Sequence, residues 1–257
     1  MIFYFSGTGN TRWAATEIQQ AVNEPMLNMA DEIDGACSYT LNEGERIGFC
    51  FPVHGWRPPK LVREFIAKLK FSSDASRHFC WALCTAGDDI GQTMEYLNKD
   101  LNLRGLHATS VFSLIMPESY VGLPFMDVDS PEKEWTKKTT AARQLSDILP
   151  YIVDREPGIT RTYKGRWPKT NSHVLGAAFV KYIVSDKLFR VKEDVCRQCG
   201  KCAAVCPVHD IQAGKGATPT WKHNGKCLTC FSCYHHCPVH AIEYGSRTKN
   251  KGQYLYY

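Results

Sequence analysis

Short apolar runs alternate with segments of helical periodicity over the first 155 residues. The apolar runs have the length of buried strands and stand at Ile2–Phe5, Pro25–Met29, Ile47–Val53, Phe79–Cys84 and Ala108–Met116. The helical segments lie between or after them, at Thr11–Val22, Pro59–Leu69, Ile90–Leu103 and Pro131–Val153. Such alternation is typical of a parallel sheet covered on both faces. The pattern predicts a doubly wound α/β domain with a five-stranded parallel sheet, at whose carboxyl edge a nucleotide binds.

The pattern changes in the second part of the chain. Residues 156–190 are basic and aromatic and are interrupted by prolines and glycines, which predicts a linker. A helix is expected to follow from about Asn171 to Leu188, with Ser172 as its N-cap. This helix is apolar nearly all round, so we expect it to pack between domains. Residues 191–245 are predicted to form a small α+β domain, and the tail at 246–257 has no predicted role.

Eight of the twelve cysteines lie in two modules 31 residues apart. Each module reads C-x2-C-x2-C-x3-C-P, the run that ligates 4Fe–4S clusters in bacterial two-cluster ferredoxins. Three cysteines at two-residue spacing can wrap one cluster, and the fourth points toward the neighbouring cluster. The sequence therefore predicts a first cluster on Cys196, Cys199, Cys202 and Cys237 and a second on Cys227, Cys230, Cys233 and Cys206.

Structural zinc is the competing interpretation of these cysteines. It is disfavoured because zinc sites use two C-x2-C pairs and have no need of a third evenly spaced cysteine. The other cysteines lack ligand spacing, and we expect them to be buried as small hydrophobic residues: Cys37, Cys50, Cys80 and Cys84. Cys84 ends a strand at the expected cofactor edge, so contact with a flavin is an alternative for it.

A loop of glycines and hydroxyl residues follows the first strand and opens a helix. Glycines permit close approach of the backbone, hydroxyls donate hydrogen bonds, and a helix N-terminus favours an anion. The loop lacks the lysine of a Walker motif and is not G-x-G-x-x-G. A monophosphate such as that of FMN suits it better than ATP or NAD. The expected phosphate-binding residues are Ser6, Gly7, Thr8, Gly9, Asn10 and Thr11.

This loop resembles the phosphate loop of flavodoxins, and the whole arrangement resembles fused flavodoxin–ferredoxin proteins. In that family an FMN-type domain precedes two 4Fe–4S modules. The resemblance covers nearly the whole chain and implies two further flavin-binding loops, one after the third strand and one after the fourth. The residues so implied are Pro52, Val53, His54, Gly55 and Trp56, and Thr85, Ala86 and Gly87.

Several side chains near these loops have two interpretations each. Trp56 is expected to stack on the flavin or to lie at the surface or between domains. His54 is a loop histidine first and a stabiliser of reduced flavin second. Asp88 or Asp89 is expected to be a helix N-cap before it is a flavin contact. Tyr120, after the last strand, is expected to line the same site.

The charge of the chain is divided unevenly. Residues 1–155 carry 15 Lys/Arg against 20 Asp/Glu, and residues 156–257 carry 16 against 6. The two parts are therefore expected to attract each other. A nucleic-acid partner is disfavoured because no recognised motif accompanies the basic segment. Membrane insertion is not expected, since the longest apolar stretch, Val174–Val184, is interrupted by Gly176 and Lys181. Clustered cysteines and the lack of a secretory segment predict a cytoplasmic protein.

The predicted function is electron transfer between two 4Fe–4S clusters and FMN, and from there to another redox protein. The alternative is an FMN-dependent reductase that delivers cluster-derived electrons to a small organic acceptor. A redox sensor is the third interpretation. No arrangement for acid–base or nucleophilic catalysis stands out, and the lack of a dinucleotide fingerprint disfavours direct use of NAD(P)H.

Overall fold

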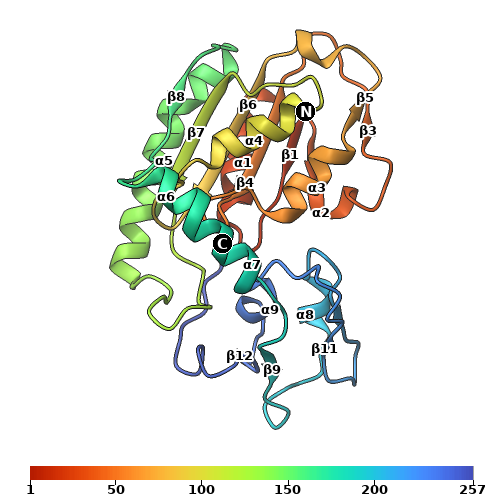
Figure 1. Cartoon of the computed structure of the whole chain (residues 1–257), viewed down its shortest axis with the longest axis vertical. Coiled ribbons are helices and arrows are strands. Elements are labelled where there is room, and N and C mark those ends of the chain that lie inside the picture. The colour runs from red at the N-terminus through yellow and green to blue at the C-terminus, as the bar shows by residue number, and fades with distance from the viewer. Residues whose placement is uncertain (257) are drawn as a thin grey trace.

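The computed structural model describes residues 1–256 and divides them into a larger α/β part and a smaller cysteine-rich part (Figure 1). The larger part contains a parallel sheet of six strands in the order β2-β1-β4-β6-β7-β8. This order confirms the doubly wound arrangement. The strands are β1 (Ile2–Tyr4), β2 (Met26–Asn28), β4 (Ile47–Pro52), β6 (Cys80–Ala86), β7 (Ser110–Ile115) and β8 (Thr160–Arg161).

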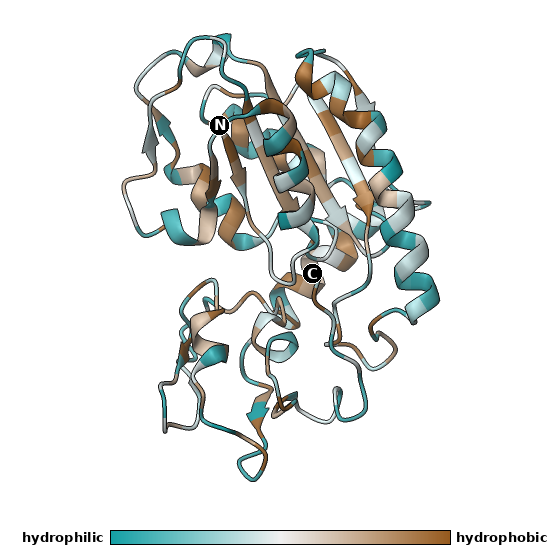
Figure 2. Ribbon diagram, turned by 180° about the vertical axis from the view of Figure 1, so that it is seen from behind, coloured by the Kyte–Doolittle hydropathy of each residue, from teal (hydrophilic) through white to brown (hydrophobic). Residues whose placement is uncertain are grey.

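Alternate residues of the central strands supply two separate cores. In β1, Ile2 faces the core under α1 (Asn10–Val22) and α5 (Pro131–Val153), whereas Phe3 faces the core under α3 (Lys60–Lys68) and α4 (Thr93–Asn102). Because successive side chains of a strand point to opposite faces, both faces need apolar residues, which is why the strands read as continuous apolar runs. Figure 2 shows hydrophobic strands inside and hydrophilic stretches on the outer helix surfaces.

Several small elements were not predicted. The sheet has a sixth strand, β8, where the sequence predicted linker, and its two residues pair with Val111 and Phe112 of β7. On the other side of the domain, a second parallel pair joins β3 (Ser38–Tyr39) to β5 (Lys70–Phe71). A four-residue helix, α2 (Met29–Glu32), and a 3-10 turn at Ala75–Arg77 complete this part. Each is too short to give a periodic signal.

The predicted helix over 171–188 begins and ends earlier than expected. The helical run consists of α6 (Pro168–Thr170), a π-helical turn (Asn171–Leu175) and α7 (Gly176–Tyr182). Ser172 is therefore inside the run and not its N-cap, and its Oγ donates instead to the carbonyl of Trp56 at 3.1 Å. Proline at the first helical position explains the earlier start. The run is also not covered on all sides, because Val174 and Tyr182 are exposed.

The cysteine-rich part has its own core and little regular structure. It contains two antiparallel strand pairs and two one-turn helices around buried aromatic residues. One pair is β9 (Phe189–Val191) with β12 (Ile242–Tyr244), the other is β10 (Ile211–Gln212) with β11 (Thr220–Trp221), and the helices are α8 (Lys201–Ala204) and α9 (Ser232–His235).

Hydrogen bonds, not ion pairs, join the two parts. Within residues 1–256, no salt bridge links residues 1–155 to residues 186–256. The basic half instead donates to loop carbonyls: Arg247 Nη1 to Gly122 at 3.0 Å, and Lys251 Nζ to Val121 at 3.0 Å. Between the acidic residues 1–155 and the basic residues 156–256 one ion pair does form, from Lys164 Nζ to Glu95 Oε1, and it lies within the larger part of the molecule.

The tail at 246–256 returns to the phosphate loop. The backbone N–H of Tyr256 donates to the carbonyl of Thr8 at 2.8 Å, and the Tyr254 hydroxyl donates to Asn10 Oδ1 at 2.6 Å. The Tyr256 ring stacks on Trp13 with centroids 5.2 Å apart. The tail thus spans both parts, and in Figure 1 it ends between them.

No helix within residues 1–256 is long and apolar enough to cross a membrane.

Candidate functional site

The eight motif cysteines surround two neighbouring cavities. One cavity holds about 340 Å³ of space free of protein atoms and is lined by Cys196, Cys199, Cys202 and Cys237. The other holds about 300 Å³ and is lined by Cys206, Cys227, Cys230 and Cys233. Each set takes three cysteines from one module and the last cysteine from the other. The fold therefore brings the cysteines together in the two crossed sets that the spacing predicted.

The two modules repeat each other in backbone detail. Gln198 and Thr229, 31 residues apart, both have positive φ, at 48° and 46°. His209 and His240 form a second such pair, at 49° and 53°. Non-glycine residues adopt this region only when the surroundings demand it. The strained turns at equal offsets show that the sequence repeat is also a structural repeat.

The strained turns direct backbone N–H groups at cysteine sulfurs. Gln198 N lies 3.4 Å from Cys196 Sγ and Thr229 N lies 3.4 Å from Cys227 Sγ. Two more such bonds are at the ends of the modules, from Asp210 N to Cys206 Sγ at 3.3 Å and from Ala241 N to Cys237 Sγ at 3.2 Å. Each cavity therefore has two donors to sulfur, and such bonds stabilise negative charge on a cluster and tune its potential.

Burial makes these thiols poor acids on their own. It raises the pKa of Cys202 to about 11 and that of Cys230 to about 12. The charge of bound iron would be needed to ionise them at neutral pH. Within residues 1–256, no group of three or more His, Cys, Asp or Glu side chains is arranged to hold a single metal ion.

A third cavity opens at the carboxyl edge of the parallel sheet, and the space free of protein atoms within and in front of it is about 1070 Å³. Thirteen of the fourteen predicted flavin residues line it: Ser6, Gly7, Thr8, Asn10, Thr11, Pro52, Val53, His54, Gly55, Trp56, Thr85, Ala86 and Gly87. Gly9 is the exception. It faces the outer side of the loop, where it lines a separate hollow with Arg12, Lys201 and His236.

The phosphate loop is held in shape by its own side chains. Ser6 Oγ accepts from Gly9 N at 3.1 Å, and the Thr11 and Thr85 hydroxyls lie 2.8 Å apart, which ties the loop to the end of β6. Helix α1 begins at Asn10 and has no acidic residue in its first turn. Its free N–H groups and dipole leave this end of the cavity suited to an anion.

His54 and Trp56 both border the cavity after β4. Burial lowers the pKa of His54 to about 4, so its imidazole is neutral at pH 7 and supplies no positive charge. Trp56 is half-buried, with a positive φ of 57° and its carbonyl bonded to Ser172. Gly55 must be glycine, because a Cβ there would lie 2.6 Å from the Phe179 ring. Helix α7 therefore packs directly on this loop at the border of the cavity.

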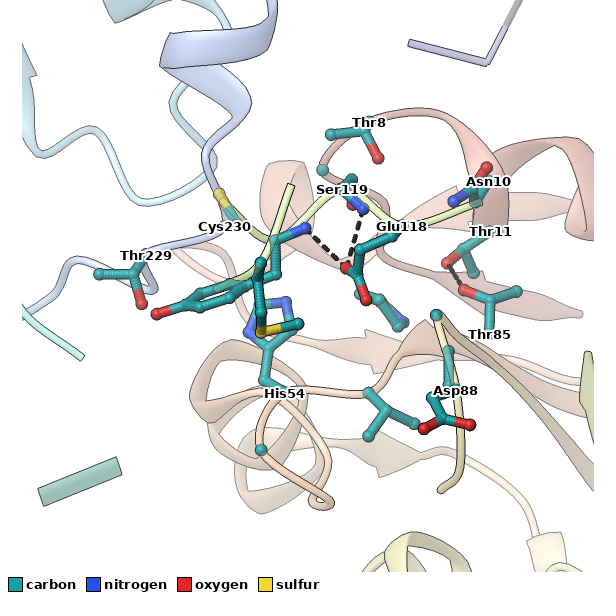
Figure 3. Close-up of a pocket in the computed structure, with 18 of the residues that line it drawn as sticks. Thr8, Asn10, Thr11, His54, Thr85, Asp88, Glu118, Ser119, Thr229 and Cys230 are labelled. Carbon is teal, nitrogen blue, oxygen red and sulfur yellow. Dashed lines mark hydrogen bonds between the residues drawn. The ribbon is translucent and has the colours of Figure 1, made fainter. Parts of the chain in front are cut away.

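Glu118 is a cavity residue that sequence reasoning missed. Its Oε1 accepts from the backbone N–H of Ser119 at 2.9 Å and of Tyr120 at 2.7 Å (Figure 3). Burial raises its pKa. Its Oε2 lies so close to Gly87 that a Cβ at that position would overlap it. No spacing in the sequence could have revealed the contact of Glu118 with Gly87, since their loops follow different strands and meet only in the fold.

Asp89 does not cap α4, which begins at Thr93 with Gln92 as its N-cap. Asp89 Oδ1 instead accepts from Gly91 N at 3.1 Å in the preceding turn. Asp88 and Asp89 both line the cavity. Cys84 does not line it: this side chain is fully buried in the core beneath α3 and α4. The alternative of a flavin contact for Cys84 therefore finds no support.

Tyr120 also lines the cavity, and its buried hydroxyl lies within hydrogen-bonding reach of the Thr229 side chain. Its ring is held edge-on by Phe179 and Phe231, at centroid distances of 5.4 and 5.2 Å. The phosphate loop, with its free N–H groups and hydroxyls, and the cavity beside it fit a phosphorylated ligand.

The flavin-type cavity and the second cysteine cavity share a wall. Leu228, Thr229 and Cys230 line both. Gly7 of the phosphate loop lies directly against Cys230, where a Cβ added to the glycine would be 3.4 Å from the cysteine Cβ. Sequence reasoning did not foresee this, because no pattern in either domain encodes their contact.

Two family models match the chain. One, described as a flavodoxin domain, covers residues 1–123, and the other, described as a 4Fe–4S dicluster domain, covers residues 188–238. These matches support flavin and iron–sulfur cluster binding. A solved structure of a protein from Bacteroides uniformis ATCC 8492, provisionally described as a flavoprotein, is 16% identical over 44% of this chain and 88% of that one, with a TM-score of 0.34. A comparison with curated proteins finds no match.

Proposed function

We propose that this chain, an iron–sulfur flavoprotein in which a flavodoxin domain precedes a 4Fe–4S dicluster domain, carries electrons between two 4Fe–4S clusters and one FMN and exchanges them with another redox protein. One-electron clusters beside a flavin able to store two electrons form a converter between the two kinds of transfer. The clustered cysteines suit a reducing cytoplasm.

The observation that carries this proposal is the shared wall of Leu228, Thr229 and Cys230. A cluster bound through Cys230 would be separated from a flavin in the adjoining cavity by this wall alone. Electrons pass between cofactors that lie close together, and this arrangement requires no movement of one domain against the other. The contact of Gly7 with Cys230 keeps the two sites together.

The clusters would form a chain that leads outward from the flavin. Cys230 of the second set borders the flavin cavity, whereas Cys199 of the first set is exposed. Cys206 and Cys237 each belong to one module and line the cavity of the other, which holds the two cavities beside each other. The expected order is therefore flavin, second cluster, first cluster.

Three groups of side chains would hold FMN. The phosphate loop and the start of α1 supply N–H groups and hydroxyls for the phosphate. The loops after β4 and β6 border the ring, with close backbone approach at Gly55 and Gly87. Tyr120 lines the same cavity from the loop after β7. Bound FMN would supply the two-electron chemistry, while these residues orient it and exclude water.

The alternative, an FMN-dependent reductase acting on a small organic acceptor, is favoured by one feature. The cavity extends past the predicted loops to three apolar side chains, Leu123, Met126 and Phe179, which border no phosphate-binding group. An organic acceptor could lie against them. Saturable steady-state reduction of such a molecule would favour this alternative, and rates that depend only on a protein partner would oppose it.

The test of the main proposal is composition followed by stepwise reduction. The protein is purified anaerobically, and iron, sulfide and flavin are quantified before a reductive titration is followed by absorbance. About eight irons and one FMN per chain are expected from two four-iron modules and one phosphate loop. A preparation without flavin, or flavin that is reduced without any exchange with the clusters, would contradict the proposal.

A further inference from the structure

Exposed apolar side chains are concentrated on one short part of the molecule. Of ten large hydrophobic residues that are exposed among residues 1–256, six lie between residues 163 and 182. Trp167, Val174 and Tyr182 are 61%, 60% and 70% exposed. Concentration of this kind marks an interaction site, because isolated apolar side chains are normally scattered over a surface.

The apolar residues follow helical spacing along the run from α6 to α7. Trp167 precedes the run, and Val174, Leu175, Ala178 and Tyr182 recur at intervals of three or four residues, all of them exposed. Residues so spaced lie along one side of a helix. We call this stripe the outer α7 face. In Figure 1 the run crosses the front of the molecule between the sheet and the cysteine-rich part.

The inner side of the same run is fixed to the flavin site. Ser172 Oγ accepts from Gln92 N at 2.8 Å, and its carbonyl accepts from Arg57 Nη2 at 2.7 Å. Phe179 lines the flavin cavity and meets Tyr120. The helix is therefore a wall of the flavin site whose outer side has no partner among residues 1–256.

Nearly all the charged residues in the segment that carries this face are basic. Residues 157–190 contain seven Lys or Arg and a single acid, Asp186, which is buried and paired with His223. Arg166, Lys169 and Lys181 are exposed beside the apolar stripe. A surface with an apolar centre and cationic neighbours is complementary to an acidic one.

We propose that the outer α7 face is the docking surface for an acidic redox protein that exchanges electrons at the flavin end of the chain. This inference rests on the proposed electron-transfer function and adds the place and the charge of the partner. A partner seated there is separated from the flavin cavity by one helix. Trp, Tyr and Arg, which are typical of interface centres, are all present on or beside the face.

Two other occupants are disfavoured by the same observations. A second copy of this chain, docked face to face, would bring two basic segments together, and like charges at an interface are strongly unfavourable. An interfacial membrane helix must sink by about 5–10 Å into the headgroup region. Here the inner side is bonded to Gln92 and Arg57, which restricts that movement.

The test uses the cofactor-loaded protein and a soluble, acidic two-iron ferredoxin as the probe. Binding is measured by titration calorimetry and electron exchange by stopped-flow absorbance, at low and high salt. The variants are K169E/K181E for charge and V174S/L175S for the apolar stripe. The matched control is K215E/K249E, which reverses two exposed lysines of the cysteine-rich part.

We expect wild-type exchange to slow with added salt and the K169E/K181E rate constant to fall at least about tenfold at low salt. V174S/L175S should weaken binding by a similar factor, whereas the control should change either quantity less than twofold. Unchanged variants, or an equal loss in the control, would overturn the proposal. The proposal would also be overturned if the wild type sedimented with anionic phosphatidylglycerol vesicles in a salt-sensitive way and the α7 variants did not.

These outcomes are separable from failure of the proposed function. Each variant is also reduced by dithionite, and its iron and flavin content is measured. Normal content and normal internal reduction together with unaltered docking would refute the docking surface alone. Missing cofactors in the wild type would refute the electron-transfer function instead.

Discussion

Gly7 of the phosphate loop lies against Cys230 of the second cysteine module, and a Cβ on the glycine would be 3.4 Å from that of the cysteine. These residues are more than 220 positions apart in the chain. The phosphate loop is therefore in van der Waals contact with the second cysteine module. This contact places the second set of cysteines beside the flavin-type cavity.

Replacing Cys230 is expected to affect the flavin more than replacing Cys199. Each of the two cysteine-to-serine substitutions should reduce the iron content, because each cysteine lines one of the two cavities. Only Cys230→Ser removes the cluster that borders the flavin, so flavin reduction should become disconnected from the remaining iron. Cys199→Ser should leave that exchange intact. Iron analysis with a reductive titration checks this, and identical loss of exchange in both variants would contradict the predicted order of cofactors.

Gly87→Ala is expected to weaken FMN binding, because the new methyl group overlaps the Glu118 carboxylate. Overpacking of this kind costs about 1–3 kcal/mol, which corresponds to roughly a fivefold to 150-fold higher Kd. Titration of the flavin-free protein by FMN fluorescence measures it. Gly214→Ala is the control, since a Cβ there meets nothing within 4 Å. Equal affinity in the two variants would show that the Glu118 loop has no part in the site.

Tyr254→Phe should loosen the phosphate loop by removing the hydroxyl that donates to Asn10 Oδ1 at 2.6 Å. A buried acceptor left without its donor costs about 1–3 kcal/mol. Urea unfolding should show this loss. Tyr182→Phe, at a residue that is 70% exposed, should change stability by less than about 0.5 kcal/mol. Indistinguishable midpoints would mean that the tail does not brace the loop.

The protein is expected to lose stability in mild acid through His54. Burial lowers its pKa to about 4 from the ordinary histidine value of 6.5. Between these pH values the unfolded chain binds a proton at His54 and the folded protein does not. The contribution of His54 to the free energy of unfolding is therefore full above pH 6.5 and falls as the pH decreases toward 4. At pH 5.5 the loss reaches up to about 1.4 kcal/mol.

The measurement for His54 is anaerobic urea unfolding at pH 7.5, 6.5 and 5.5 for the wild type and His54→Gln. The difference between the two proteins reports the histidine, because both carry the same clusters. The stability advantage of the wild type should shrink as the pH falls. A constant difference would mean that His54 is already exposed to protonation in the folded state.

The parts of the fold that depend on periodicity could be predicted from the sequence. Five strands and four long helices each carry a repeated apolar signal, and the doubly wound order is confirmed. The strand β8 could not be predicted, because two residues carry no period. The start of the helical run was misplaced because Pro168, a residue that begins helices, was interpreted as part of the linker.

The parts of the site that depend on local chemistry were also predictable. The crossed cysteine sets are brought together as their spacing indicated. The phosphate loop and the two loops implied by the flavodoxin resemblance meet at one cavity, except for Gly9. Glu118 and Thr229 were not found, since each reaches the cavity from a separate element. Their place is determined by packing between distant segments, which a single sequence does not record.

The most direct test of the account is a flash-photolysis measurement of electron exchange between flavin and clusters. Flavin in the anaerobic holoprotein is reduced by a light pulse in the presence of an external donor, and cluster absorbance is followed at several protein concentrations. Cofactors on either side of the wall at Cys230 predict a first-order rate that does not change with protein concentration. A rate that rises in proportion to protein concentration would place the transfer between molecules and contradict the account.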